Sequence, residues 1–488
     1  MTNILGISAG FHDAAISVID RKGDILFAGH SERYSGIKND PTVDPELVHE
    51  ANQLGYNHVA VYERPWMHNI QKLYSGQRPF APWTTRGFIR KHLKQSNFSF
   101  STSSHSHHLS HAAAGFQTSP FSEAAVVVID AIGELDTISI YHASYDSKGR
   151  ARYQCRWRQR YPHSIGLFYS AITKSVGLKP QEDEYITMGM AAYGTDSGQA
   201  HLEQAVVADA DEIRFKQNLH IGFDDDEWKN VKPENLAAAA QSTVEKLIMT
   251  VMRRAKELVP SNNLVYMGGV ALNCVANTRL EQLYDCVWIM PNPGDAGSSL
   301  GAAALVYEKQ LNWHDAYLGH NIKGDYPVEE VLQELLTTGI VGVASGRAEF
   351  GPRALGNRSL LADPRGSDIK DRVNEIKRRQ KFRPFAPIVL EEHYSENFKG
   401  PANPYMQFTS CCTNRDLYPA ICHVDGTSRV QTVPNDNSGV RQLLEAWYAQ
   451  TGCPMLLNTS LNIRGEPMVN NRSDADRFEK LYNVRVFS

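Results

Sequence analysis

A histidine-rich segment at residues 107–116, with the sequence HHLSHAAAGF, places the strongest constraint on how this chain folds. His107 and His111 are four residues apart, so on an α-helix both imidazoles lie on one face and can bind one ion. The apolar run at residues 124–129 then predicts a buried strand that ends at Asp130. A carboxylate at the carboxyl end of such a strand lies where open α/β sheets bind their ligands. The segment therefore predicts a helix and a strand that meet at a ligand site.

A second carboxylate, Asp295, lies in the glycine-rich turn PGDAG, which is followed by a helix of small residues. Together with His107, His111 and Asp130 it makes a mixed nitrogen and oxygen donor set that suits a divalent metal. A zinc-peptidase interpretation fails, because His108 stands where that motif requires a general-base glutamate. The alternative is a helix whose histidines only cap the helix or form hydrogen bonds.

The composition limits the class of protein. At 488 residues the chain is too long for a single core and predicts two or three domains. The net charge of −4 provides no overall field that would draw the protein onto nucleic acid or a membrane. Seven cysteines without a C-x-x-C pair argue against a disulfide framework and against a thiolate zinc site. The sequence shows no leader segment and no apolar run of membrane-spanning length, so we expect a soluble, cytoplasmic protein without a membrane partner.

Glycine turns suggest a nucleotide fold in the N-terminal part of the chain. Residues 3–8 and 14–19 read as two strands joined by a turn that carries His12 and Asp13, an arrangement typical of the phosphate loop of actin-like ATPases. A plain hairpin would favour Asn-Gly at its tip, so the presence of His12 and Asp13 there favours a functional turn. Further along, a strand at residues 264–267 is followed by Gly268 and Gly269 and a helix start, which allows close approach to a phosphate. Combined, these turns indicate a ribonuclease-H-like nucleotide fold.

The last third of the chain has a different character. Residues 311–326 read as a polar joint, followed by a helix at 328–338 and a strand at 340–344. An arginine-rich loop is then expected at residues 346–359, with arginines among glycines and a proline. Guanidinium forks in such a loop suit phosphate or carboxylate groups. A strand that begins near residue 454 turns abruptly polar at Asn458, so it is expected to present amides and hydroxyls at its end.

These motifs together resemble the O-carbamoyltransferases that include the nodulation-factor, cephem and tobramycin carbamoyltransferases. The matching segments span nearly the whole chain and are GFHDAA at 10–15, the histidine pair at 107–111, a loop at 184–194, GGVALN at 268–273, GDAG at 294–297, GPRALG at 351–356, FRPFAP at 382–387, DGTSR at 425–429 and LNTS at 457–460.

The resemblance implies an α/β and α+β protein with two domains. Residues 1–320 would form a duplicated ribonuclease-H-like, actin-like ATPase domain similar to the tRNA threonylcarbamoyl transferases. Residues 327–488 would form an α/β domain similar to threonylcarbamoyl-AMP synthase. The C-terminal domain would make carbamoyl-AMP from ATP and carbamoyl phosphate, and the N-terminal domain would move the carbamoyl group to an acceptor hydroxyl.

The resemblance also implies the site residues. His107, His111, Asp130 and Asp295 would hold the metal, Fe²⁺ as in family relatives, with Mg²⁺ or Mn²⁺ as alternatives. His12 would act as general base beside the acceptor hydroxyl, and Lys38 would line the same pocket. The predicted nucleotide and phosphate contacts are Gly268, Gly269, Asn273, Arg347, Arg353, Lys377, Arg383, Asn458, Ser460 and Asn462.

The sequence departs from the family pattern at two positions. It does not fix the oligomeric state, for which a homodimer is one option. Ala131 follows Asp130 where relatives usually carry glycine, so that turn is expected to differ. Thr187 stands where a lysine is expected, which would alter acceptor or nucleotide contacts. The chain also ends soon after Tyr482, earlier than in many relatives.

The acceptor is not named by the motifs. We favour 5-hydroxymethylcytosine in DNA, as a virus-type relative would use, over the hydroxyl of a sugar or other small metabolite. A cluster of positive charge without acids at residues 86–94 and an aromatic-rich insertion at 66–100 support this choice, as do eight positive against three acidic residues at 365–383. The overall charge of −4 argues the other way, so binding would depend on a local patch.

Three other functions compete with carbamoyl transfer. An actin-fold kinase would use ATP at the N-terminal site alone and would leave the arginine-rich domain unexplained. A tRNA threonylcarbamoyl-type enzyme would need threonine and bicarbonate. A non-catalytic nucleotide sensor would not need to retain the polar residues of both candidate sites.

Overall fold

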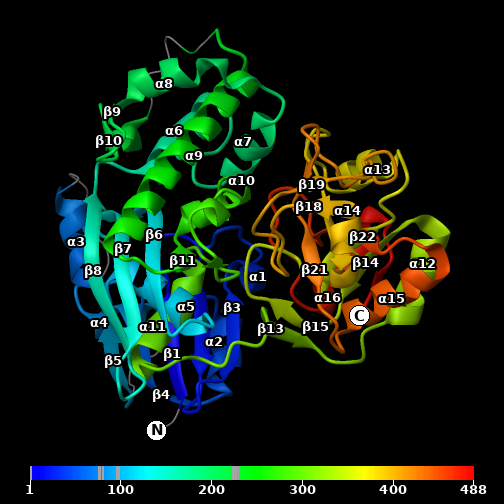
Figure 1. Ribbon diagram of the computed structural model, residues 1–488. Helices are drawn as coiled ribbons and strands as arrows, with labels where there is room; N and C mark the ends of the chain where they lie inside the picture. The colour runs from blue at the N-terminus through cyan, green and yellow to red at the C-terminus, as the bar shows by residue number, and fades with distance from the viewer. Residues whose placement is uncertain (1–2, 75–77, 80–81, 95–98, 223–227, 229) are drawn as a thin grey trace. The chain divides into compact units, whose positions relative to one another are not determined.

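The chain divides between two units in the computed structural model, which describes residues 3–74, 78–79, 82–94, 99–222, 228 and 230–488 (Figure 1). Unit 1 is Met1–Ser35 with Asn39–Asp315, and unit 2 is Gly36–Lys38 with Ala316–Ser488. Within the predicted insertion at residues 66–100, positions 75–77, 80–81 and 95–98 lie outside the described residues.

Unit 1 opens with a mixed five-stranded sheet in the order β3-β2-β1-β4-β5. β1 to β3 form an antiparallel meander, and β4 and β5 add parallel to β1. Buried apolar residues run along β1, β2 and β4, which explains why these segments form the centre of the sheet. The strands are β1 (Asn3–Ser8), β2 (Ala15–Ile19), β3 (Ile25–His30), β4 (Tyr56–Val61) and β5 (Ser101–Ser104).

A second five-stranded sheet in unit 1 repeats this topology. Its order is β12-β11-β6-β7-β8, in which β6 to β8 are the antiparallel meander and β11 and β12 add in parallel. The strands are β6 (Glu123–Gly133), β7 (Asp136–Tyr145), β8 (Ala151–Arg160), β11 (Asn263–Met267) and β12 (Cys286–Trp288). Two copies of one strand order confirm the predicted duplicated, ribonuclease-H-like domain. β6 runs past residue 129, so Asp130 lies within the end of the strand rather than directly after it.

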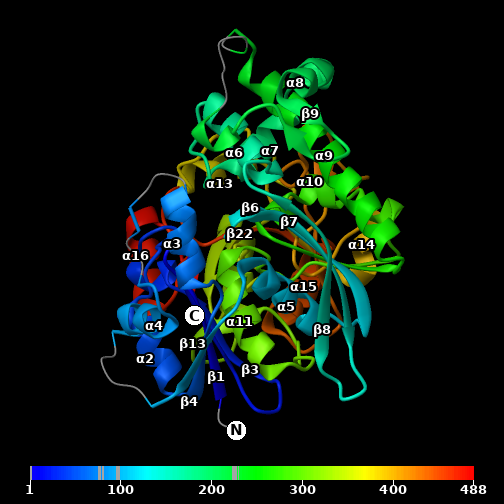
Figure 2. The same ribbon diagram turned by 90° about the vertical axis from the view of Figure 1, so that its left-hand side faces the viewer.

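Two helices of small residues lie between the sheets of unit 1 (Figures 1 and 2). α11 (Ser298–Tyr307) packs on β1, β2 and β4, whereas α5 (His107–Thr118) packs on β6 and β11. The two helices also contact each other closely, because a Cβ atom added at Gly301 would lie 1.8 Å from the carbonyl oxygen of Ser110. The predicted histidine helix is therefore confirmed and is held at short range by a glycine on its neighbour.

Replacing Gly301 by alanine is expected to destabilise unit 1. The new methyl group would overlap a backbone carbonyl, which cannot rotate away, and such overpacking costs about 1–3 kcal/mol. Thermal unfolding should show a melting temperature lowered by several degrees. Gly198→Ala is the matched control, because a Cβ atom there meets nothing closer than 3.9 Å. Equal melting temperatures for the two variants would show that α5 and α11 can separate without penalty.

Among the other helices of unit 1, α2 and α4 pack on the first sheet and α6 and α9 on the second, whereas α7 and α8 pack on α9. The longest is α9, which carries a proline in its first turn, where proline is tolerated. Among the described residues, no helix is both long and apolar enough to cross a membrane. The helices are α1 (Glu32–Ser35), α2 (Pro45–Asn52), α3 (Pro65–Tyr74), α4 (Thr85–Leu93), α6 (Ile165–Ser175), α7 (Glu184–Ala191), α8 (Gln199–Val206), α9 (Pro233–Leu258) and α10 (Cys274–Asn277), with a small hairpin of β9 (Val207–Asp209) and β10 (Arg214–Phe215).

The prediction of a loop at residues 184–194 is wrong, because most of this segment forms α7. Ile186 and Thr187 are buried and the helix packs against α6 and α9. The mixture of glycine and methionine hides the helical period, and the packing partner is distant in sequence. Tertiary contact therefore decides the structure of this segment.

Unit 2 is built on a six-stranded mixed sheet in the order β21-β17-β22-β16-β14-β23. The strands of this sheet are β14 (Ile340–Ala344), β16 (Arg358–Ala362), β17 (Ala386–Leu390), β21 (Gln431–Val433), β22 (Met455–Ser460) and β23 (Val486–Phe487). Smaller pairings join β13 (Tyr317–Ile322) with β15 (Gly346–Glu349), and β18 (Phe398–Lys399) with β19 (Ser410–Cys412) and β20 (Thr427–Ser428). The helices are α12 (Val328–Thr338), α13 (Ile369–Ile376), α14 (Tyr394–Asn397), α15 (Gly439–Thr451) and α16 (Arg472–Tyr482).

Two predicted irregular segments of unit 2 are partly strands. The joint expected at residues 311–326 contains β13, and the loop expected at 346–359 contains β15 and the start of β16. Arg358 explains part of the error, because its fully buried guanidinium donates to backbone carbonyls of Ser345 and Asn470. This arginine stabilises the fold, whereas the sequence suggested a phosphate contact.

Candidate active site

The structure brings together the four side chains predicted as metal ligands. The Nε2 atom of His107 lies 3.1 Å from Nε2 of His111, 3.4 Å from Oδ2 of Asp130 and 3.2 Å from Oδ1 of Asp295. The Nε2 atom of His111 lies 3.1 Å and 3.3 Å from the same two carboxylate oxygens. All four residues are buried, and one donor atom of each lies within 4.8 Å of all the others.

These distances fit a central ion. Two ligands about 2.1 Å from an ion lie about 3.0 Å apart at a right angle and about 3.4 Å apart at the tetrahedral angle. The five separations between the donor atoms fall in or near this interval. Two imidazole nitrogens 3.1 Å apart also cannot both carry a proton between them, whereas both can donate a lone pair to a cation. The donor set of two imidazoles and two carboxylates suits Fe²⁺, Mn²⁺ or Zn²⁺ better than Ca²⁺.

Three segments of the fold supply these ligands. His107 and His111 lie one turn apart on α5, and Asp130 lies near the end of β6, on which α5 packs. Asp295 opens a short 3₁₀ turn, Asp295–Gly297, that leads into α11. The neighbouring His108 points elsewhere, since its Nδ1 atom lies 2.8 Å from Oγ of Ser139.

Charge is concentrated at this site. Burial raises the pKa of the Asp130 carboxyl, but the contacts with His107 and His111 outweigh burial and hold it well below its usual range. Burial lowers the pKa of His107, whereas Asp295 and Asp130 raise it well above its usual value. Buried carboxylates of this kind require a positive partner. A divalent cation would supply it in place of protons on the two imidazoles.

A third carboxylate, the largely buried Glu63, lies behind His107 and was not predicted from the sequence. Its Oε1 atom is 3.5 Å from Nδ1 of His107, and its Oε2 atom is 3.3 Å from Nδ1 of His68. Burial raises the pKa of the Glu63 carboxyl, but the two histidines lower it to about 2. The signal was present, because Glu63 follows β4 just as Asp130 follows a buried run.

His12 lies beside the four-residue site. Its Nδ1 atom is 2.9 Å from Oδ2 of Asp13, and its Nε2 atom is 3.7 Å from Oδ2 of Asp295. Burial lowers the pKa of His12, but Asp295 and Asp13 outweigh burial and raise it to about 9. Lys38 belongs to unit 2 in the structure, so its place in the pocket of His12 stays a prediction.

The glycine turn after β11 borders the same site. Gly268 has a φ of +92°, and a Cβ atom there would lie 2.2 Å from the carbonyl oxygen of Ile129, so only glycine fits. A Cβ atom at Gly269 would lie 3.2 Å from Oδ1 of Asp130. Asn273 caps α10 and exchanges hydrogen bonds with Gln241. The nucleotide contacts of these three residues stay predictions.

Both departures from the family pattern have a local structural role. The backbone N–H of Ala131 donates to Oδ1 of Asp130 at 2.8 Å, an interaction that does not require glycine. The hydroxyl of Thr187 is buried and lies 2.9 Å from that of Thr173.

In unit 2, three of the predicted phosphate residues meet at the end of β22. The buried Nζ of Lys377 donates to Oδ1 of Asn462 at 2.9 Å and to Oγ of Ser460 at 3.2 Å, and it also contacts the backbone carbonyls of both residues. Burial, followed by the charges of Arg379 and Arg383, lowers the pKa of Lys377 well below its usual value.

The other predicted residues of unit 2 are more dispersed. Asn458 is buried and donates to the carbonyl of Ala354 at 3.0 Å, directly after Arg353 in the chain. Arg347 donates to the carbonyl of Leu318 at 2.7 Å. Arg353 and Arg383 are half-buried. Their phosphate contacts stay predictions.

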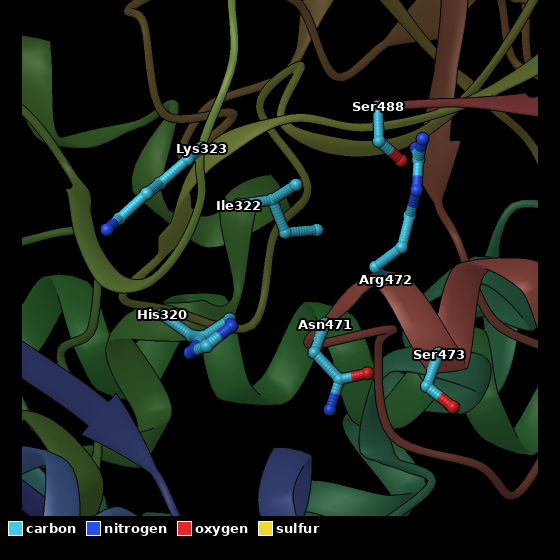
Figure 3. Close-up of a pocket in the computed structure, with 7 residues that line it drawn as sticks. All are labelled: His320, Ile322, Lys323, Asn471, Arg472, Ser473 and Ser488. Carbon is cyan, nitrogen blue, oxygen red and sulfur yellow. The ribbon is translucent and has the colours of Figure 1, made fainter.

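A pocket of about 490 Å³ lies elsewhere in unit 2 and shares no residue with the predicted set (Figure 3). In the figure the side chain of Arg472 extends toward Ser488, whereas Lys323 points away from the other labelled residues. The lining residues are His320, Ile322, Lys323, Asn471, Arg472, Ser473 and Ser488.

Comparison with known proteins identifies the family. Residues 61–304 match the family model described as carbamoyltransferase N-terminus, and residues 332–487 match the one described as carbamoyltransferase C-terminus. The chain is 30% identical to 3'-hydroxymethylcephem-O-carbamoyltransferase of Amycolatopsis lactamdurans, covering 95% of this chain and 94% of that protein. It is 33% identical to nodulation protein NolNO of Sinorhizobium fredii, covering 76% of this chain and 60% of that protein.

Solved structures resemble the chain more distantly. The activator of the 2-hydroxyisocaproyl-CoA dehydratase from Clostridium difficile, solved with bound ADPNP, covers 63% of this chain with 14% identity and a TM-score of 0.36. A likeness of this size carries no functional argument, so the sequence matches decide the family. The chain belongs to the carbamoyltransferase family and is a transferase enzyme.

Proposed function

We propose that this protein is an ATP-dependent O-carbamoyltransferase with two linked reaction centres. The observation that carries the proposal is the convergence of His107, His111, Asp130 and Asp295, with His12 beside them, in a member of the carbamoyltransferase family. Residues 327–488 would activate the carbamoyl group, and residues 1–320 would transfer it to a hydroxyl.

Activation would take place in unit 2. Carbamoyl phosphate, water and ATP would give carbamoyl-AMP, phosphate and pyrophosphate. Several phosphate charges must be held together for this reaction, and Lys377 with Arg353 and Arg383 offers the positive charge. Lys377 already contacts Ser460 and Asn462 in the structure, so its amino group is positioned before a substrate arrives, and bound phosphate charges would favour its protonated form.

Transfer would take place in unit 1. The acceptor hydroxyl would attack the carbamoyl carbon and AMP would leave, while His12 takes the hydroxyl proton. The residues His107, His111, Asp130 and Asp295 would hold a divalent ion, which when bound stabilises negative charge on the phosphoryl group. That ion would also offset the charges of the two aspartates, so the pKa of His12 would move down from about 9 toward neutrality.

Formation of AMP by the pure protein tests the proposal. Release of pyrophosphate that depends on carbamoyl phosphate is the expected result, with AMP released once an acceptor hydroxyl or water takes the carbamoyl group. ATP turnover that depends on threonine and bicarbonate would identify a tRNA threonylcarbamoyl-type enzyme instead. ADP formation without carbamoyl phosphate would identify a kinase.

For the acceptor we propose 5-hydroxymethylcytosine in DNA. Support comes from α4, which carries Arg86, Arg90 and Lys91 on its exposed face while Phe88 and Ile89 are buried. Exposed tryptophans, at positions 66 and 83, occur in the same insertion and could stack on bases. A base in a duplex would have to flip out to reach His12.

We expect the protein, supplied with carbamoyl phosphate, ATP and metal, to carbamoylate DNA that contains hydroxymethylcytosine. Digestion and mass spectrometry should show nucleosides heavier by one carbamoyl group. The yield should fall steeply with salt, and Arg86→Ala combined with Arg90→Ala should reduce it further, because both arginines would contact phosphates. Unmodified DNA, together with carbamoylation of a free sugar or nucleoside, would reject this acceptor.

A small metabolite is the second candidate acceptor. The similarity to an enzyme named for a hydroxymethylcephem supports a primary hydroxyl on a small molecule, and it covers nearly the whole chain. In that case the paired arginine variant would retain full activity, and salt would have little effect.

A further inference from the structure

Glu63 lies directly behind the candidate metal site. It follows β4 and precedes α3, and its side chain is only 12% exposed. One of its carboxylate oxygens faces Nδ1 of His107 at 3.5 Å, and the other faces Nδ1 of His68 at 3.3 Å. Glu63 therefore links the ring of His107 to a second histidine on α3.

The ring of His107 has a fixed orientation. Its Nε2 atom faces His111, Asp130 and Asp295, while its Nδ1 atom faces away from them toward Glu63. The ring of Tyr62, fully buried, lies against it with ring centres 5.1 Å apart. A neutral imidazole that offers Nε2 to an ion must carry its proton on Nδ1, and that N–H needs an acceptor.

His107 and His111 differ in what lies near their Nδ1 atoms. Over the part of the chain that the structure describes, the Nδ1 atoms of His107 and His111 are both buried without a hydrogen bond at normal distance. The Nδ1 atom of His107 nevertheless has a carboxylate oxygen 3.5 Å away, and a shift of about 0.7 Å would make a charge-assisted hydrogen bond. Glu63 also borders a small pocket of about 20 Å³, which leaves room for such a shift.

We propose that Glu63 is a positioning residue that accepts the Nδ1 proton of His107 and thereby holds Nε2 of that ring toward the bound ion. His68 restrains the other carboxylate oxygen, so the side chains of His68, Glu63 and His107 form one connected series that fixes the orientation of the His107 ring. Glu63 acts through His107 and does not touch the ion or the substrate. The inference rests on the metal role assigned to His107, His111, Asp130 and Asp295 in the proposed function.

The affinity of the whole protein for Co²⁺ tests this role. Co²⁺ would be titrated against a chromophoric chelator, and its visible absorption would be recorded in wild type, Glu63→Gln and Glu63→Asp. Removing an outer-shell partner typically weakens metal binding about 10- to 100-fold, and we expect Glu63→Gln to fall in this range. Glu63→Asp keeps the carboxylate, so it should recover part of the affinity. The melting temperature of metal-free Glu63→Gln would be recorded to show that it is folded, and a modest fall is expected because the variant loses a carboxylate that His107 and His68 stabilise.

The matched control is Glu134→Gln, which changes a buried carboxylate of unit 1 that pairs with Arg64. Its Co²⁺ affinity should equal that of wild type. If Glu63→Gln keeps wild-type affinity, or if both glutamine variants lose affinity equally, the role of Glu63 is overturned while the ligand set still stands. Failure of the wild type to bind Co²⁺ would overturn the ligand set and this inference together.

Discussion

Asp295→Ala protein is expected to lose its metal and its carbamoyl transfer, yet to continue forming carbamoyl-AMP. Asp295 supplies one of four converging donors, so its loss should weaken metal binding by more than the roughly 100-fold typical of outer-shell changes. The half-reaction in unit 2 uses other residues and should survive. Metal content by mass spectrometry, pyrophosphate release and product formation would be measured on the same samples.

His111→Ala should behave in the same way, because it removes another donor of the same set. Asp295→Asn serves as an isosteric second variant in case the alanine protein folds poorly. Asp146→Asn, in a hairpin turn where the carboxylate contacts Arg150 and Arg152, should retain metal and transfer. Full metal occupancy in both Asp295 and His111 variants would mean that the ion binds elsewhere.

Arg353→Ala is expected to abolish carbamoyl-AMP formation while transfer from supplied carbamoyl-AMP survives. Arg353 lies in unit 2, whereas the histidine site lies in unit 1. Loss of a bidentate phosphate contact should cost about 2–4 kcal/mol, which corresponds to a decrease of roughly 30- to 1000-fold in rate. Pyrophosphate release reports the first reaction, and carbamoylated product from added carbamoyl-AMP reports the second.

Arg477→Ala provides the control for this experiment. Arg477 is an exposed arginine of unit 2 that pairs with Glu466, so its removal should change neither half-reaction. An equal decrease of both half-reactions in Arg353→Ala would contradict a model with two separate centres.

The sequence identifies the elements that have a clear local pattern. The histidine helix, α12 and β14 can all be predicted, since each combines a regular apolar pattern with a recognisable start or end. The segment that forms α7 escapes prediction, because glycine and methionine carry little local preference and the helix is determined by α9. β13 and β15 escape it because each is short and pairs with a strand that is not adjacent in the chain.

The candidate site is predictable to a similar extent. The spacing of His107 and His111 and the position of Asp130 suggest a ligand set from the amino-acid sequence alone. The position of Glu63 after β4 is a signal like that of Asp130, but its contact with His107 depends on tertiary packing that no local pattern reports. Arg358 shows the opposite error, since an arginine in a glycine-rich segment resembles a phosphate contact but is used to satisfy buried carbonyls.

The four converging donors come from segments that are far apart along the chain. His107 and His111 belong to the helix that packs on the second sheet, whereas Asp295 leads into the helix that packs on the first. An ion shared by them would act as a reversible cross-link between these segments, and because it binds the folded state it would shift the folding equilibrium toward that state. Loss of the metal would then lower both the activity of the enzyme and its resistance to proteolysis, because a protein without the ion would unfold more readily.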